Sequence, residues 1–202
     1  MARASSRRIG VMGGTFDPIH IGHLVTADEA RHAFALDEVI FVPAGRPWQK
    51  DAEEVSGVED RYRMTLIATA ADPGFGVSRV EIERDGPSYA IDTLRALKKE
   101  HPFAELFFVT GADAILQILT WKEPEKVLAE ARFIAATRPG YDLERLEKEL
   151  PEGLEERVIT LEIPALAISS TDIRRRVGEG RPIAYLVPPG VAAYIEKAGL
   201  YR

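Results

Sequence analysis

The segment Gly13-Gly14-Thr15-Phe16-Asp17-Pro18-Ile19-His20-Ile21-Gly22-His23 follows a short apolar run, Ile9–Met12, and leads into a stretch with helical spacing. Glycines, a hydroxyl group and two imidazoles therefore meet at one strand-to-helix turn. Glycine lets the backbone approach an anion closely, and the first N–H groups of a helix point at negative charge in the preceding turn. The segment predicts a phosphate-binding site near the start of the chain.

Along the rest of the chain, short apolar runs rich in β-branched and aromatic residues alternate with longer segments of helical spacing. The expected strands are Ile9–Met12, Val39–Val42, Val77–Ile82, Leu106–Thr110, Phe133–Ala136 and Val158–Ile163. The expected helices between them are Leu24–Ala35, Glu59–Ala71, Ala90–Glu100, Ala112–Leu119, Glu125–Ala131 and Leu143–Leu150. Parallel neighbouring strands need a crossover, and helices are the usual crossover. We therefore expect an α/β fold with a Rossmann-like, doubly wound, largely parallel sheet and helices on both faces.

The pattern changes after Ile163. Pro164–Ile168 predicts a loop, Thr171–Gly178 a short basic helix and Pro189–Ala198 a terminal helix. We expect one domain over residues 1–202, with a Rossmann-like core in residues 1–163 and a small C-terminal helical segment in residues 164–202. Ligands of parallel sheets gather at the carboxyl ends of the strands, where the first turn would lie.

The composition argues against several classes of protein. A chain of 202 residues with 46% hydrophobic content can bury a full core. The formal net charge of -6 argues against a general nucleic-acid surface, and the absence of cysteine excludes disulfides, thiolate metal sites and a cysteine nucleophile. No uncharged run approaches the roughly 18 residues of a membrane span, so we expect a soluble, cytoplasmic protein with no membrane partner.

His20 and His23 are three residues apart. If the helix has begun by His20, the two side chains lie about 60° apart around its axis, close enough to touch one ligand. The ordinary alternative is that one histidine caps the helix and the other packs in the core. A metal site would need more ligands, but His32 lies about 180° around the same helix and His101 ends another one.

A second polar segment, Ile168-Ser169-Ser170-Thr171-Asp172-Ile173-Arg174, lies at the expected start of the short C-terminal helix. Its ordinary interpretation is a helix cap followed by a solvated arginine face. Free N–H groups, hydroxyl donors and the Arg174 guanidinium would also suit a polyphosphate. Two anion sites, one near each end of the chain, suit a nucleoside triphosphate bound between them.

These two segments together resemble the nucleotidyltransferase superfamily, and nearly the whole chain resembles the bacterial nicotinate-nucleotide adenylyltransferases. Further matching pieces are Phe41-Val42-Pro43-Ala44-Gly45, Gly86-Pro87-Ser88-Tyr89, Asp92-Thr93-Leu94, Thr110-Gly111-Ala112-Asp113, Trp121 and Arg138-Pro139-Gly140. The related pantetheine-phosphate adenylyltransferases carry Thr at the position of His20, which therefore favours the mononucleotide enzymes. The chain departs from the family at Gln49, where His is common, and at Ala90, where Thr is common.

The resemblance implies transfer of AMP from ATP to nicotinate mononucleotide, which gives deamido-NAD and pyrophosphate in NAD biosynthesis. The implied catalytic residues are His20, His23 and Arg174. Those implied for ATP are Gly13, Gly14, Thr15, Phe16, His20, His23, Gly111, Asp113, Ile168, Ser169, Ser170, Thr171 and Arg174. Those implied for the acceptor are Lys50, Ser88, Tyr89, Thr93, Trp121 and Arg138. Mg²⁺ is expected on the phosphates of ATP, with no metal site built by the protein.

Residues outside the two phosphate segments also have ordinary structural interpretations. They are a strand-end glycine with a capping aspartate at Gly111 and Asp113, a packing aromatic at Trp121, a turn with a half-buried aromatic at Ser88 and Tyr89, and a solvated lysine at Lys50. Other functions stay open as well: a nucleotidyltransferase with a different acceptor, an enzyme that accepts both the acid and the amide mononucleotide, or a non-catalytic nucleotide sensor. We expect no nucleic-acid partner, and the sequence is compatible with a homo-oligomer.

Overall fold

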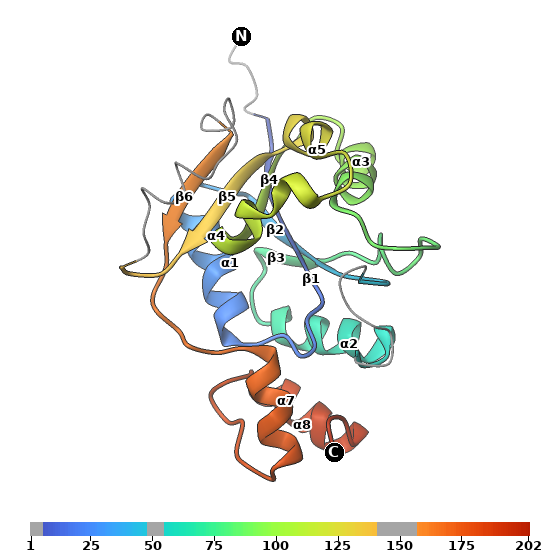
Figure 1. The fold of residues 1–202 in the computed structure, drawn as a ribbon, viewed down its shortest axis with the longest axis vertical. Helices are drawn as coiled ribbons and strands as arrows, with labels where there is room; N and C mark the ends of the chain where they lie inside the picture. Colours follow the sequence, from blue (N-terminus) through green and yellow to red (C-terminus); the bar gives the residue numbers. More distant parts are fainter. Residues whose placement is uncertain (1–5, 48–54, 141–156) are drawn as a thin grey trace.

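A six-stranded parallel sheet forms the centre of the molecule (Figure 1). The computed structural model describes residues 6–47, 55–140 and 157–202. The strands are β1 (Arg8–Gly14), β2 (Glu38–Pro43), β3 (Phe75–Val77), β4 (Glu105–Gly111), β5 (Arg132–Thr137) and β6 (Val158–Glu162). Their order is β3-β2-β1-β4-β5-β6 and every pairing is parallel. This is the order of a doubly wound, Rossmann-like sheet, so the expected fold class is confirmed.

Helices connect the strands and follow the last of them. They are α1 (Ile21–Ala33), α2 (Val58–Thr69), α3 (Ala90–Glu100), α4 (Ala112–Leu116), α5 (Pro124–Glu130), α7 (Ser170–Gly178) and α8 (Pro189–Ala198). A short 3₁₀ helix, Ile118–Thr120, follows α4 where the sequence predicted one continuous helix. The expected helix Leu143–Leu150 lies outside the described residues. Within the described ranges, no helix is both long and apolar enough to cross a bilayer.

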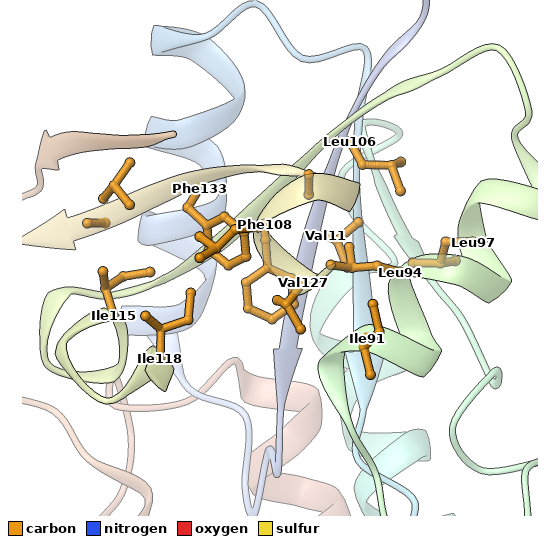
Figure 2. Packing of buried hydrophobic residues seen from close by; sticks show 14 of the residues in the cluster. Val11, Ile91, Leu94, Leu97, Leu106, Phe108, Ile115, Ile118, Val127 and Phe133 are labelled. Atoms are coloured by element: carbon orange, nitrogen blue, oxygen red, sulfur yellow. The ribbon is translucent and has the colours of Figure 1, made fainter. Parts of the chain in front are cut away.

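Helices cover both faces of the sheet. Because successive residues of a strand point to opposite sides, each buried strand contributes side chains to both faces. On one face, Val11 and Phe108 pack with apolar residues of α3, α4 and α5, and Figure 2 shows this cluster. On the other face, Met12 and Phe107 pack with residues of α1, α2, α7 and α8. The helices on both faces fix the sheet, so that the carboxyl ends of its strands form a rigid edge.

The strand expected at Val77–Ile82 is wrong for most of its length. β3 ends at Val77, and the following residues turn, with the N–H groups of Ile82 and Glu83 donating to the Arg79 carbonyl over 2.8 and 2.9 Å. These turn hydrogen bonds replace a sheet ladder, so tertiary context overrides the local strand propensity. As a result Glu81 points into the protein and is 7% exposed.

The C-terminal helices lie beyond the carboxyl ends of the strands, against the loop that follows β1 (Figure 1). The Ser170 hydroxyl donates to the Pro18 carbonyl over 2.9 Å, and Arg174 Nη1 donates to the Asp17 carbonyl over 2.8 Å. The Ile21 N–H also donates to the Leu186 carbonyl over 2.9 Å. The two polar segments from opposite ends of the chain are therefore in direct contact.

Candidate active site

Two cavities open at the carboxyl ends of β1 and β4, the strands between which the order of the sheet reverses. Gly13 at the end of β1 and Thr110 at the end of β4 line both cavities. In doubly wound sheets ligands bind outside this reversal point. A ligand in one cavity would therefore lie next to a ligand in the other.

The first cavity, of about 240 Å³, is called here the aromatic cavity because Tyr89, Phe108 and Trp121 form much of its wall. Trp121 packs edge-on against Phe108, with ring centres 5.8 Å apart. Gly14 and Thr15 line the same cavity beside Gly13. It combines an aromatic wall suited to a flat ring with a glycine-rich wall suited to an anion.

The second cavity, of about 320 Å³, is called here the histidine cavity because His20 and His23 line it together. Gly111 from the end of β4 and Ile168 from the loop before α7 lie in the same wall. Arg138, which directly follows β5, lines this cavity as well. The fold thus brings residues from both ends of the chain around one space.

The two histidines form a fixed pair at the start of α1. His20 is the N-cap residue with an extended backbone, and its ring stacks on His23 with centres 3.7 Å apart. The His20 N–H donates to His23 Nδ1 over 3.2 Å, while the Phe16 ring meets His23 edge-on at 5.1 Å. Because Nδ1 of His23 accepts a hydrogen bond, the proton of the neutral ring is on Nε2, which is then a donor.

Burial sets the charge state of this pair. Desolvation lowers the pKa of His20 to about 4, and desolvation together with the nearby His20 lowers the pKa of His23 to about 3. Both rings are therefore neutral near pH 7 and offer N–H groups without a full positive charge. In agreement with the ordinary interpretation, His20 caps the helix and His23 packs against Phe16. Both side chains nevertheless line the histidine cavity.

We expect the protein to lose stability as the pH falls from about 6.5 towards 4. Each histidine titrates near 6.5 in the unfolded chain but at about 4 or 3 when folded, so only the unfolded state takes up these protons in that window. By linkage each histidine contributes about 3 kcal/mol between pH 6.5 and pH 4, so the expected loss in unfolding free energy is about 6 kcal/mol, measured by urea denaturation at several pH values. His23→Asn should remove a large part of this slope, and an unaltered slope in that variant would contradict the assignment.

The C-terminal segment presents its polar groups next to the loop that follows β1. Ser169 is the N-cap of α7 and its hydroxyl accepts the Asp172 N–H over 3.1 Å, which agrees with the ordinary capping interpretation. Arg174 reaches from α7 to the Asp17 carbonyl and, at 3.5 Å, to the Thr171 hydroxyl. The guanidinium therefore lies between the N-terminus of α7 and the turn of residues 13–20 that joins β1 to α1, called here the glycine-rich loop.

Of the remaining predicted residues, only some line one of the two cavities. Ser88 and Tyr89 line the aromatic cavity, whereas Arg138 lines the histidine cavity. Thr93 lines neither cavity: it is 1% exposed, and its hydroxyl donates to Glu81 Oε1 behind the wall. Asp113 is exposed in the first turn of α4. Lys50 lies outside the described residues.

Arg61 of α2 is an important residue that the sequence pattern did not indicate. Its side chain is fully buried, with the residue 2% exposed, and it donates to the carbonyls of Thr15, Gly45 and Ser56 over 2.8, 3.2 and 3.0 Å. A helix arginine is normally solvated, and no spacing signal marks this one. It joins the glycine-rich loop to the loop after β2, and both loops border the aromatic cavity.

Asp17, which lies in the loop between β1 and α1, is a second buried residue that joins this loop to distant parts of the chain. It is 1% exposed, and its carboxylate accepts the Tyr201 hydroxyl over 2.7 Å and the Ser56 N–H over 3.2 Å. Both partners are distant from Asp17 in the chain. The penultimate residue of the chain thus helps to hold the first loop.

Comparison with known proteins places the chain among nucleotidyltransferases. The family model described as cytidylyltransferase-like matches residues 11–176. A protein of Leifsonia xyli named "Probable nicotinate-nucleotide adenylyltransferase" is 58% identical over 202 residues, which are 100% of this chain and 98% of the relative. A protein of Clavibacter michiganensis with the same name is 60% identical over 195 residues, 96% of this chain and 94% of the relative.

A solved structure is similar in fold. The Plasmodium falciparum nicotinic acid mononucleotide adenylyltransferase complexed with NaAD has a TM-score of 0.80, with 24% sequence identity over 96% of this chain and 97% of that chain. At this identity the likeness supports the fold class.

Proposed function

Because the chain belongs to the cytidylyltransferase-like family, alongside relatives named for nicotinate-nucleotide adenylyltransferase, we propose that it transfers AMP from ATP to nicotinate mononucleotide. The products are deamido-NAD and pyrophosphate. The observation that carries this proposal is the meeting of the histidine and aromatic cavities over Gly13 and Thr110. Two substrates bound there would bring their phosphates together at the reversal point of the sheet.

The reaction is an in-line displacement at the α-phosphorus of ATP. An oxygen of the acceptor 5′-phosphate forms a bond to that phosphorus, and the bond to the oxygen bridging the α- and β-phosphates breaks, so the electron pair leaves with pyrophosphate. The acceptor phosphate is already a nucleophile, so the protein need not supply one. Its task is to align two anions and to stabilise the charge that builds on the transferred group and the leaving group.

We assign His20 and His23 to the non-bridging oxygens of the α-phosphate. Both rings line the histidine cavity, and the Nε2–H of His23 is held as a donor by the hydrogen bond to Nδ1. Backbone N–H groups of Gly14 and Thr15, which line the aromatic cavity beside Gly13, assist in binding the α-phosphate. Neutral donors fixed before the reaction stabilise developing charge without reorganising, which is the main requirement for this chemistry.

Arg174 and the hydroxyls of Ser169, Ser170 and Thr171 are assigned to the β- and γ-phosphates. The contact of Arg174 with the Asp17 carbonyl brings the cap of α7 to the glycine-rich loop, which supports this role. Gly111, Asp113 and Ile168 are assigned to the nucleoside of ATP, with Phe16 supporting the histidine pair. Arg138 is assigned to ATP as well, because it lines the histidine cavity.

The acceptor is assigned to the aromatic cavity, with its flat ring against Trp121 and with Ser88 and Tyr89 in the wall. Thr93 acts from behind the wall through Glu81. Mg²⁺ is proposed to arrive on the phosphates of ATP as part of the substrate, which is its common mode of binding. Within the described ranges no three His, Asp or Glu side chains are grouped as metal ligands.

The proposal is tested by pyrophosphate release from ATP against a small panel of acceptors. We expect release with nicotinate mononucleotide to exceed that with pantetheine phosphate by at least about 10²-fold, since an acceptor without the flat ring loses the aromatic wall. Release only with another acceptor would show a different transferase. Binding of ATP without release with any acceptor would show a nucleotide sensor.

A further inference from the structure

Tyr201, which follows α8, is bonded to the glycine-rich loop. α8 ends at Ala198, and the Tyr201 hydroxyl then donates to Asp17 Oδ1 over 2.7 Å. The backbone of Tyr201 has a φ of 65°, a region that residues with a Cβ rarely occupy. A residue held in this region is fixed by its tertiary contacts rather than by local preference.

The bond between Tyr201 and Asp17 is buried and persistent. Burial raises the pKa of Tyr201, and the hydrogen bond to Asp17 raises it further, so the phenol keeps its proton and remains a donor near pH 7. Asp17 is 1% exposed, and its other carboxylate oxygen accepts the Ser56 N–H over 3.2 Å. A phenylalanine at position 201 would therefore leave a buried carboxylate oxygen without this donor.

The backbone next to this carboxylate holds the groups of α7 that were assigned to phosphate. The Asp17 carbonyl accepts Arg174 Nη1 over 2.8 Å. The Pro18 carbonyl accepts the Ser170 hydroxyl over 2.9 Å. Because the carboxylate and the carbonyl belong to one residue, a change at the Asp17 side chain also moves the acceptor of the Arg174 guanidinium. A guanidinium has five N–H donors, so this bond leaves others for a ligand.

We propose that Tyr201 is a positioning residue for the transfer reaction: by fixing Asp17, it holds the Arg174 guanidinium in the orientation that stabilises the leaving pyrophosphate. Tyr201 lines neither cavity, so it acts through Asp17 and Arg174 and not by contact with a substrate. The inference rests on the proposed function, which assigns Arg174 to the β- and γ-phosphates. Misplacing a catalytic group by about 1 Å can cost about 10²-fold in rate, so a hydrogen bond this close to Arg174 can control turnover.

The test is the effect of Tyr201→Phe on kcat in two backgrounds. In the otherwise wild-type protein, kcat for pyrophosphate release should fall about three- to tenfold. KM for nicotinate mononucleotide should change less than about twofold, because Tyr201 does not line the aromatic cavity. In the Arg174→Met protein the same substitution should change kcat less than about twofold, because the group through which Tyr201 acts is gone.

The matched control is Tyr194→Phe on α8. The Tyr194 hydroxyl donates to Asp60 Oδ1 of α2 over 2.6 Å, so it also joins the C-terminal segment to a carboxylate, but neither residue lines a cavity. This variant should keep kcat within about twofold of the wild type. Urea denaturation of both variants checks that folded proteins are compared. An equal loss of kcat in Tyr194→Phe would show a general loosening of the C-terminal segment and would overturn the inference.

The outcomes separate this inference from the proposed function. If the wild-type protein converts nicotinate mononucleotide and Tyr201→Phe has no effect, or lowers kcat by the same factor in both backgrounds, the inference is overturned and the function stands. An Arg174→Met protein with the wild-type kcat overturns it too, because Arg174 then does not act on the leaving group. If the wild-type protein converts no acceptor, the proposed function fails and the inference fails with it.

Discussion

His23→Ala is expected to lower kcat by about 10²–10³-fold, the usual loss when one preorganised donor to a developing charge is removed. The donor is Nε2–H, because Nδ1 of His23 already accepts the His20 N–H. Its hydrogen bond should strengthen as charge builds on the α-phosphate, so kcat should fall more than KM for ATP rises. Steady-state kinetics with ATP varied at a saturating concentration of the acceptor measures this split.

Two further variants control for the fold of α1. His32→Ala removes an exposed histidine from the same helix and should leave kcat unchanged. His23→Gln places an amide N–H near the position of Nε2 and should recover part of the lost rate. A His23→Ala protein that binds ATP and turns over at the wild-type rate would remove His23 from the reaction.

The sequence predicted the parts of the site that are local in the chain. Gly13–His23 carries its own strand-to-helix turn, so its glycines and histidines could be assigned to one loop, and they line the two cavities. The sequence also predicted that this loop and the Ser169–Arg174 segment lie close enough to bind one triphosphate between them, because both are suited to anions. The described structure brings them together through Arg174 and Asp17.

Features that depend on long-range topology could not be predicted. Arg138 was assigned to the acceptor, but it follows β5, whose carboxyl end opens on the histidine cavity. Glu81 lies in an apolar run typical of a strand, yet the chain turns there and buries the carboxylate. Neither result follows from local propensity, because each is fixed by residues distant in the chain.

Arg61 is the clearest case of a residue whose role local sequence patterns could not predict. Its replacement is expected to have the second large effect. Arg61→Met should lower the unfolding free energy by about 3–5 kcal/mol, because it removes the donors of three carbonyls in the protein interior. It should also lower kcat/KM for both substrates, since the loops of Thr15 and Gly45 lose their common anchor. Urea denaturation and steady-state kinetics measure the two effects.

The matched control is Arg63→Met, which removes an exposed arginine from the same helix with one long hydrogen bond of 3.4 Å to Tyr194. It should change stability far less than Arg61→Met, and equal losses would contradict the anchoring role. Arg61→Lys keeps the charge, but a lysine ammonium lacks the planar fork that reaches three separate carbonyls. We therefore expect Arg61→Lys to recover only part of the stability, whereas full recovery would mean that the buried charge, rather than the hydrogen bonds, holds the loops.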